Sequence, residues 1–545
     1  MKKLLIGLLA VLSMIFVVAC GDKKATEEAK VVRFNLQSNP PQLDPQLNTD
    51  STSGNVLGHV LEGLTTLGQD GNPIPGVAES WTTEGNVWTF KLRKDSKWHN
   101  GDSVVAGDFL AAWERALNPK VASEYSYIMY SIKGAEDYNQ GKSTDFSTVG
   151  VKAPDDYTLV VELKEPVAYF ASLVSFYTFA PQNQKFFEEH KDSYATSSET
   201  FMGNGPYKLV SWDFENKIVL EKVDTYWNKD SIKIDTIEMA MINDTSASLK
   251  AYQNDELDWS LLPAEEIAKH KASPEFVSWE DGSTWYFQFN TSKKIFSNKK
   301  IRKAISMAID RQTLVDKVKN GGGSVAESFV PGIIPGKKGT FREDYPQSAY
   351  GVGFNPEGAK KLFAEGLAEL GMKASDVGKI TLLTQNNDVA TKESQFYQEQ
   401  LKVNLGLDIQ LEPVTFQIRI QRTTAKDFDV VLSGWGPDYN DPMTFLDLWL
   451  STSGQNNTSW ASTQYDSIIN AAKAEVDPAK RMDLLASAEK FLMEEMPIVP
   501  TFYRKRAALI KPHLKNVVDR AARAFLPPLL NYLASRDARY HLHHR

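Results

Sequence analysis

The chain has 545 residues, 42% of them hydrophobic and 24% charged, with 61 basic and 69 acidic side chains and a net charge of −8. That length is too great for a single domain, and the apolar content is ample for large cores. The charges are mixed along the chain without a polybasic block, which argues against nucleic acid or an anionic membrane surface as partners.

The N-terminus has the pattern of a secretory signal. Lys2 and Lys3 precede an apolar run of 16 residues, 4–19, which is shorter than a membrane-spanning helix needs, so residues 1–19 are predicted to be cleaved. Cys20 follows and is the only cysteine, which excludes a disulfide within the chain. Residues 17–20 resemble the sequence read by bacterial lipoprotein signal peptidase. That resemblance implies a lipidated Cys20 that anchors the protein to the membrane outside the cytoplasm, with 20–30 as linker. The alternative is an ordinary signal with an incidental cysteine.

Strand and helix patterns alternate through the first half of the mature chain. Alternation of apolar and polar residues predicts strands, whereas apolar residues at helical spacing predict amphipathic helices. The predicted strands are 31–36, 88–92 and 158–163, and the predicted helices are 56–64 and 102–117.

The second half shows the same alternation. Trp285, Phe287 and Phe289 fall on one face of a strand that we expect to face the core, which leaves Tyr286 on the other face as a candidate pocket residue. Phe502 and Tyr503 lie at the end of another predicted strand and are further candidate pocket residues. The predicted strands are 283–289, 380–384, 407–414 and 496–503, and the predicted helices are 301–318, 465–474, 479–493 and one that ends near 401.

A polar loop follows a short strand at 428–432. The strand is predicted to break at Ser433 and Gly434, and Gly436 and Pro437 continue the turn into an acidic, aromatic segment with Asp438. Such a loop places a carboxylate beside exposed backbone groups, as a polar binding site or a cation site requires. The alternative is that Asp438 and Asp441 only cap a turn.

Several phrases resemble the oligopeptide-binding proteins of ABC importers, which are extracytoplasmic solute-binding proteins of family 5. The phrases are GWGPDYNDPMTFLD at 434–447, LDP, LEGL, PGVAESW, WTFKLR, KWHNGDSV, NGPYKLVSW, VDTYWN and AIDR, in family order. The resemblance implies an α/β, two-lobe periplasmic-binding-protein fold, class II-like, with a subdomain inserted in the N-terminal lobe. The implied segments are 31–74 and 183–282 in lobe I, 75–182 as the inserted subdomain, 283–503 as lobe II, and 504–545 returning to lobe I.

The resemblance also implies which residues meet the ligand. Asp438 would take the α-amino group of a peptide, and the loop around it would pair with the peptide backbone. The other implied site residues are Gly434, Trp435, Gly436, Tyr439, Glu62, Gly63 and Tyr125. Glu62 as a solvated helix residue and Tyr125 as a core aromatic are the alternatives.

Some relatives fix the peptide's C-terminal carboxylate with a histidine, an arginine and a lysine. Leu432 stands at the position of that arginine, and the stretch QNNDVATKE offers no histidine, so only Lys319 remains. A weaker preference for one peptide length follows. The alternative for Lys319 is a plain cation at the end of a helix.

The implied function is capture of oligopeptides and their delivery to the membrane subunits of an ABC permease, by a monomer without cofactor or metal. A receptor of the same fold for a peptide pheromone, nickel, heme or a sugar is the alternative, and an enzyme or adhesin is a third. The sequence has no HExxH, GxSxG, Walker or CxxC motif, and the SxxK at 297–300 lies in a Lys-rich turn.

The C-terminal end departs from the family pattern after Pro512. The closing stretch is rich in Arg and Ala and bears no likeness to the family's last strand. A frameshift and a genuine variation are the two explanations, and loss of that strand would weaken the lobe that holds both termini.

Overall fold

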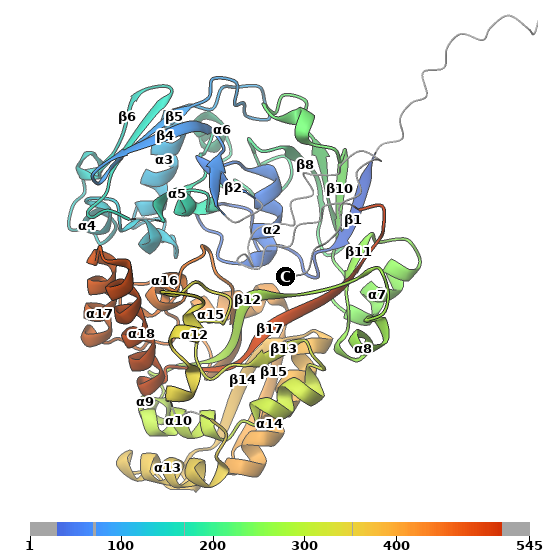
Figure 1. The fold of residues 1–545 in the computed structure, drawn as a ribbon, viewed down its shortest axis with the longest axis vertical. Helices are drawn as coiled ribbons and strands as arrows, with labels where there is room; N and C mark the ends of the chain where they lie inside the picture. The colour runs from blue at the N-terminus through green and yellow to red at the C-terminus, as the bar shows by residue number, and fades with distance from the viewer. Residues whose placement is uncertain (1–29, 69–71, 168, 351–352, 515–545) are drawn as a thin grey trace, which may run out of the picture.

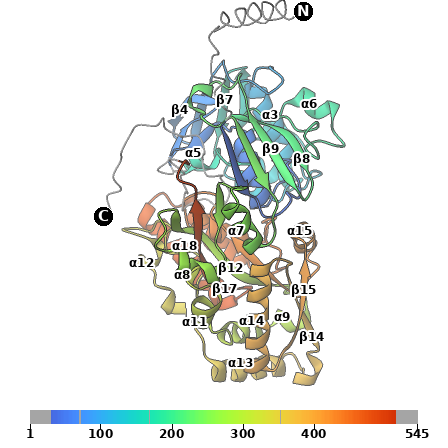
Figure 2. The same cartoon turned by 90° about the vertical axis from the view of Figure 1, so that its right-hand side faces the viewer.

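The structure is a computed structural model that describes residues 30–68, 72–167, 169–350 and 353–514. The predicted signal 1–19, the predicted lipidation site Cys20 and the tail from 515 lie outside the described residues. Figures 1 and 2 show two lobes, one above the other, that meet where β12 and β17 cross between them.

One twisted sheet runs through both lobes. Its eleven strands in the described residues follow the order β15-β14-β16-β12-β17-β11-β1-β10-β9-β8, with β13 paired to β17. Their bounds are β1 Val31–Asn35, β8 Tyr207–Asp213, β9 Lys217–Lys222, β10 Thr236–Ala240, β11 Trp259–Leu261, β12 Phe276–Phe289, β13 Gly323–Val325, β14 Lys379–Gln385, β15 Asp408–Val414, β16 Val430–Trp435 and β17 Ile498–Ile510.

The lobes are joined by the long antiparallel pair of β12 and β17. Their register runs from Phe276 opposite Leu509 to Gln288 opposite Ile498, with an irregularity between Glu280 and Thr284. Each strand therefore crosses a predicted lobe boundary, β12 at 282–283 and β17 at 503–504. The boundaries themselves stay predictions.

A smaller antiparallel sheet forms the far side of the upper lobe. Its order is β4-β5-β7-β6, and β5 alternates as its sequence predicts, with Trp88, Phe90 and Leu92 buried and the first two packed against Phe170 of α5. The bounds in this region are β2 Thr65–Leu67, β3 Pro73–Pro75, β4 Ala78–Glu84, β5 Val87–Leu92, β6 Val151–Asp155, β7 Thr158–Glu162, α3 Ala106–Leu117, α4 Ala135–Asn139, α5 Phe170–Leu173 and α6 Gln184–Glu189.

The remaining helices cover the large sheet and the lower lobe. Their bounds are α2 Ser51–Val60, α7 Thr245–Gln253, α8 Ile267–His270, α9 Lys294–Ser297, α10 Lys299–Met307, α11 Arg311–Thr313, α12 Phe341–Asp344, α13 Pro356–Glu369, α14 Asp388–Leu405, α15 Phe416–Thr424, α16 Met443–Leu446, α17 Thr463–Ala474 and α18 Pro478–Glu495. None of the helices within the described residues is long and apolar enough to cross a membrane.

Several predicted elements have wrong bounds. The strand expected at 283–289 begins at Phe276, and the strand expected at 496–503 runs on to Ile510. The helix expected at 56–64 begins at Ser51, because Asp50 caps it by accepting a hydrogen bond from the Ser53 backbone N–H. The helix expected at 301–318 ends at Met307, and Asp310 then caps a new helical segment. Both pieces bury residues in one core, so the apolar spacing continues across the break. The strand expected to break at Ser433 runs on to Trp435 because β12 pairs with it that far.

Candidate functional site

A cavity of about 630 Å³ lies where the lobes meet, and we call it the interlobe cavity. Lobe I lines it with residues that include Asp50, Asn55 and Trp259, and lobe II lines it with residues that include Thr384 and Gly436. Residues of β12 and β17 complete the wall at the junction. A concave site between lobes is the usual place for a ligand in a two-lobe protein.

The cavity wall carries polar atoms that have no hydrogen-bond partner among the described residues. These buried atoms are the indole Nε1 of Trp259, Trp279 and Trp285, Gln288 Oε1, Thr384 Oγ1 and Gln455 Nε2. Buried polar groups are normally paired. The described residues therefore leave several polar atoms of the lining residues unpaired, and the lining is polar in character.

Asp438 is not itself a lining residue; it lies two residues beyond Gly436 of the cavity wall, and its buried carboxylate is only half engaged. Its side chain is 7% exposed, Tyr125 donates its hydroxyl to Oδ1 at 3.4 Å, and Oδ2 has no partner among the described residues. Burial raises the pKa of Asp438 well above its usual range, and the nearby Asp447 raises it further. A cation at Oδ2 would remove this cost.

Asp441, three residues on, is fully engaged. It accepts a hydrogen bond from the Met443 backbone N–H at 2.9 Å and pairs with both terminal nitrogens of Arg481 at 2.8 Å each. The alternative of turn capping therefore holds for Asp441. The side chain of Asp438, in contrast, accepts no backbone hydrogen bond from any residue that the structure describes.

The residues before Asp438 form one wall of the cavity. Trp435 donates its indole N–H to the Thr444 carbonyl at 3.0 Å, and Gly434, Trp435 and Gly436 all line the cavity. Gly434 packs against the indole of Trp285, which lies 2.8 Å from where a β-carbon would sit. A side chain at Gly434 would push that ring out of place.

Tyr439 joins the two lobes without lining the cavity. Its ring stacks on that of Tyr169 with centroids 5.0 Å apart and an interplanar angle of 4°. Tyr169 precedes α5 in the upper lobe, so the stack holds the Asp438 loop against that lobe.

Glu62 and Gly63 also lie outside the cavity lining. The Glu62 carboxylate accepts hydrogen bonds from the Tyr226 hydroxyl at 2.5 Å and the Trp227 indole at 2.8 Å, and burial raises the pKa of Glu62 to about 7. A β-carbon on Gly63 would lie 2.9 Å from the Val174 carbonyl oxygen. Both residues therefore pack against other segments of the upper lobe, Glu62 against Tyr226 and Trp227 and Gly63 against Val174.

Tyr286 and Lys319 both line the cavity. Tyr286 packs edge-on against Phe329 and Trp449, with ring centroids 4.9 Å and 5.8 Å away. Lys319 forms an ion pair with the buried Glu393, and its Nζ lies 4.4 Å from the centroid of the Phe502 ring. Its charge is therefore already compensated.

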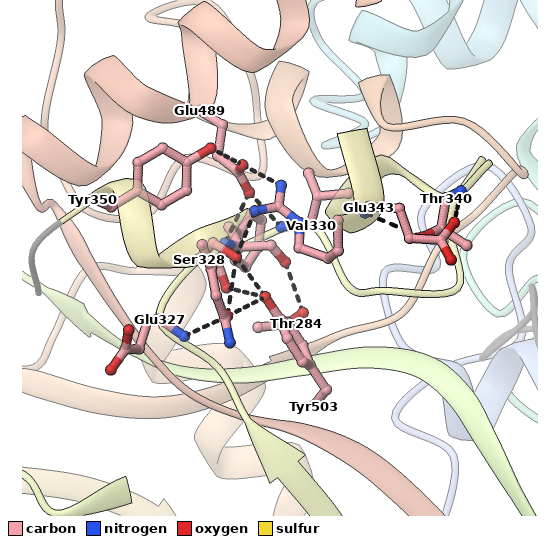
Figure 3. Close-up of polar contacts among 12 residues, drawn as sticks. Thr284, Glu327, Ser328, Val330, Thr340, Glu343, Tyr350, Glu489 and Tyr503 are labelled. Carbon is pink, nitrogen blue, oxygen red and sulfur yellow. Dashed lines mark hydrogen bonds and ion pairs between the residues drawn. The ribbon is translucent and has the colours of Figure 1, made fainter. Parts of the chain in front are cut away.

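Tyr503 belongs to a buried polar network outside the cavity lining, drawn in Figure 3. Its hydroxyl lies 2.5 Å from Ser328 Oγ and donates to the Ser328 carbonyl at 3.0 Å. At the other end of the network, the fully buried Glu489 accepts the Tyr350 hydroxyl at 2.6 Å and pairs with Arg342.

The sequence did not indicate most of the charged groups that line the cavity, among them Asp50, Glu124 and Arg419. Asp50 and Glu124 come from the upper lobe, and Arg419 comes from α15 in the lower lobe. Burial raises the pKa of Asp50 to about 6 and that of Glu124 to about 7. Asp50 carries a recognisable helix-capping signal, whereas Arg419 lies in an ordinary amphipathic stretch with no local signal. Within the described residues, no group of three or more His, Cys, Asp and Glu could hold a metal ion.

Comparison with known families identifies the architecture. Residues 72–457 match the family model described as bacterial extracellular solute-binding proteins, family 5 middle. The chain belongs to this family. It is 36% identical over 509 residues to the oligopeptide-binding protein OppA of Bacillus subtilis, with 91% of each chain covered.

Solved relatives in this family also indicate the arrangement of the lobes. Listeria monocytogenes OppA bound to peptide superposes with a TM-score of 0.85 at 35% identity, covering 92% of this chain and 97% of that one. The unliganded open form of the murein tripeptide-binding protein MppA from Escherichia coli gives only 0.58 at 29% identity, covering 90% and 94%. The lobes here are thus arranged more like those of the peptide-bound relative.

Proposed function

We propose that this family 5 protein captures oligopeptides outside the cytoplasm and delivers them to the membrane subunits of an ABC permease. The observation that carries the proposal is the buried Asp438 carboxylate with its unpartnered Oδ2, two residues beyond the Gly436 wall of a polar cavity. A peptide's α-ammonium group is a cation that would pair with this oxygen. The peptide-binding names of the similar proteins support the same ligand class.

The strand that leads to Asp438 supports backbone recognition. β12 pairs with β16 through Trp435, but β14 pairs with it only at Val430 and Val431 among the described residues. The edge of β16 beyond Val431 is therefore open to an added strand. A peptide paired there would be bound through its backbone, which every peptide has, and Asp438 would set its register.

The other predicted site residues divide into two roles under this proposal. Gly434, Trp435, Gly436, Tyr286 and Lys319 line the space for the peptide, and Tyr125 orients the Asp438 carboxylate. The remaining predicted residues lie outside the cavity lining and support the surrounding structure, namely Tyr439, Glu62, Gly63 and Tyr503.

The proposal includes a lipid anchor at Cys20, a monomeric state and release of the peptide unaltered. The single cysteine directly after an apolar signal supports the anchor. Mass spectrometry of the N-terminal tryptic peptide from a membrane extract tests it. An unmodified Cys20 would exclude the anchor.

Calorimetric titration with short alanine peptides tests the ligand class. The wild-type protein is expected to bind peptides with a free N-terminus and to bind their N-acetylated forms at least tenfold more weakly, because the neutral amide cannot pair with Asp438. Asp438→Asn should bind both forms alike. Mass analysis of the peptide after incubation should show it intact.

A matched control is Asp447→Asn, another buried carboxylate near the loop, which Lys473 approaches at 3.7 Å. It should keep the preference for a free N-terminus. Failure of the wild-type protein to bind any peptide from a broad mixture would reject the proposed function.

A further inference from the structure

The cationic side chains that line the interlobe cavity are unequally compensated. Lys319 pairs with Glu393, and Arg504 and Arg506 each donate Nε to Asp281 Oδ2 at 2.6 Å. Lys505 is exposed at the surface. The remaining lining cation is Arg419, which is half-buried.

The guanidinium of Arg419 forms no ion pair or hydrogen bond with any residue that the structure describes, although helix α15 fixes its backbone. Its carbon lies 5.4 Å from the centroid of the Phe416 ring, one turn earlier on the same helix. Burial lowers the pKa of Arg419 to about 10, so the group stays charged at neutral pH. Arg419 is only half-buried, so its charge keeps part of its hydration, but no residue that the structure describes supplies a counterion.

Asp50 is the carboxylate of the upper lobe whose charge influences Arg419, but it is already committed. Its Oδ1 accepts the Ser53 backbone N–H at 2.8 Å and its Oδ2 accepts the Ser53 hydroxyl at 2.7 Å, at the start of α2. Burial raises the pKa of Asp50 to about 6, so the carboxylate is still mostly ionised at neutral pH, but both of its oxygens are engaged by Ser53. Asp50 therefore does not complete the pairing of Arg419.

Tyr286 lies on the lower-lobe side of the same space and also influences Arg419 electrostatically. No hydrogen bond of its hydroxyl to another described residue is found, and Tyr286 lines the cavity with Arg419. A guanidinium and a phenol hydroxyl that both lack acceptors provide the donors that a carboxylate requires.

We propose that Arg419 binds a carboxylate of the captured peptide, supplied by its C-terminus or by an acidic side chain. This inference rests on the proposed function and deepens it. With the ammonium at Asp438 and a carboxylate at Arg419, the buried Asp438 and the half-buried Arg419 would each gain a counterion from one ligand. Arg419 would then select peptides by length if the C-terminus is bound, or by sequence if a side chain is bound.

The experiment is calorimetric titration of wild type, Arg419→Gln and Arg422→Gln with two sets of alanine peptides. The first set has three to six residues with either a free or an amidated C-terminus. The second set is amidated throughout and carries one Glu at each position in turn. Arg422 lies on the same helix but pairs with Glu412 and Asp427 at the surface, so it controls for loss of a positive charge on α15.

Wild type and Arg422→Gln should bind at least one carboxylate-bearing peptide tenfold or more tightly than its neutral counterpart. Arg419→Gln should lose that preference and bind the neutral peptide as well as wild type does. Preference for one length in the first set identifies the C-terminus, and preference for one Glu position identifies a side chain. Thermal melting should show that Arg419→Gln folds, since it removes an unpaired charge.

Two results would overturn the inference while leaving the proposed function intact. One is an unchanged carboxylate preference in Arg419→Gln. The other is an equal loss for acidic and neutral peptides, which would indicate that Arg419 acts on the closed lobes and not on a ligand carboxylate. If no peptide bound to the wild-type protein, the proposed function itself would fail.

Discussion

The polar residues of the site differ in whether the protein supplies their partners. Asp441 has Arg481, and Asp281 has Arg504 and Arg506, so these carboxylates are compensated within the chain. Asp438 has only a long hydrogen bond from Tyr125. An uncompensated charge lowers the stability of the empty protein and becomes favourable only when a ligand pairs with it.

This imbalance predicts a pH-dependent stability difference between wild type and Asp438→Asn without ligand. The folded-state pKa of Asp438 is raised above its unfolded value, so the stability from the protonated form is present at low pH and is lost as pH rises through the folded pKa. Asp438→Asn does not titrate at this site. Its unfolding free energy should therefore exceed that of wild type by about 1 to 3 kcal/mol at pH 8, with a smaller difference at pH 4.

Urea unfolding at pH 4, 6 and 8 measures this difference. Glu357→Gln, which changes an exposed carboxylate, serves as the control and should follow the wild-type pH profile. A constant difference between Asp438→Asn and wild type at all three pH values would contradict the predicted ionisation cost.

At the scale of elements, the chain after β13 is fixed to α18 by one buried carboxylate. Glu489 Oε1 accepts the backbone N–H groups of Phe329 and Val330 at 3.0 and 2.8 Å, while Oε2 pairs with Arg342 and accepts the Tyr350 hydroxyl. The Tyr503 hydroxyl on β17 holds the same segment through Ser328. The network thus joins α18, β17 and the segment that passes α12.

Removing the charge of Glu489 should be strongly destabilising. Glu489→Gln would leave Arg342 buried without its counterion, so we expect the unfolding free energy to fall by about 3 to 5 kcal/mol. Chemical denaturation measures it, with Glu162→Gln as the control because its pair with Lys133 is exposed and should cost less than about 1 kcal/mol. Equal losses in the two variants would contradict a network role.

The variant Tyr503→Phe tests whether the Glu489 network affects stability without affecting peptide binding. Loss of the hydroxyl bonded to Ser328 should cost about 1 kcal/mol of stability. Peptide affinity should stay within twofold of wild type, because Tyr503 does not line the interlobe cavity. A large loss of affinity with unchanged stability would instead make Tyr503 a ligand contact.

At the scale of the whole molecule, the two lobes touch through side chains on both sides of the cavity. Thr245 donates its hydroxyl to Asp388 at 2.5 Å, and Gln385 donates to Ser38 at 3.2 Å. Aromatic side chains also meet between the lobes: Tyr439 stacks on Tyr169, and the ring of Trp435 lies 6.3 Å from that of Tyr125. Because β12 and β17 are continuous between the lobes, the lobes can separate by bending that strand pair once these side-chain contacts are broken.

We expect peptide binding to close the protein in solution. Small-angle X-ray scattering should give a larger radius of gyration for the empty protein and a decrease on adding a saturating peptide, because the ligand pairs with both lobes. Asp438→Asn should require more peptide to reach the same decrease. An identical radius with and without bound peptide would show that the lobes are fixed.

The sequence by itself determined the family, the two-lobe α/β class and most of the strands. These features depend on local information, such as the alternation of Trp88, Phe90 and Leu92 in β5 or the order of short motifs. It also indicated the Asp438 loop, because a strand that ends in Gly and Pro before acidic residues is a local pattern. It misplaced the helix near 301–318, since apolar spacing alone does not show where a capping Asp310 interrupts the backbone.

Only the tertiary structure decided which charges are paired. Lys319 and Glu393 are 74 residues apart, and Glu489 and Arg342 are 147 apart, so their pairing depends on how the elements pack. The same holds for the absence of a described partner at Asp438 Oδ2 and at the Arg419 guanidinium. Local sequence fixes where a charge lies along an element, but packing of distant elements fixes whether that charge is compensated or left for a ligand.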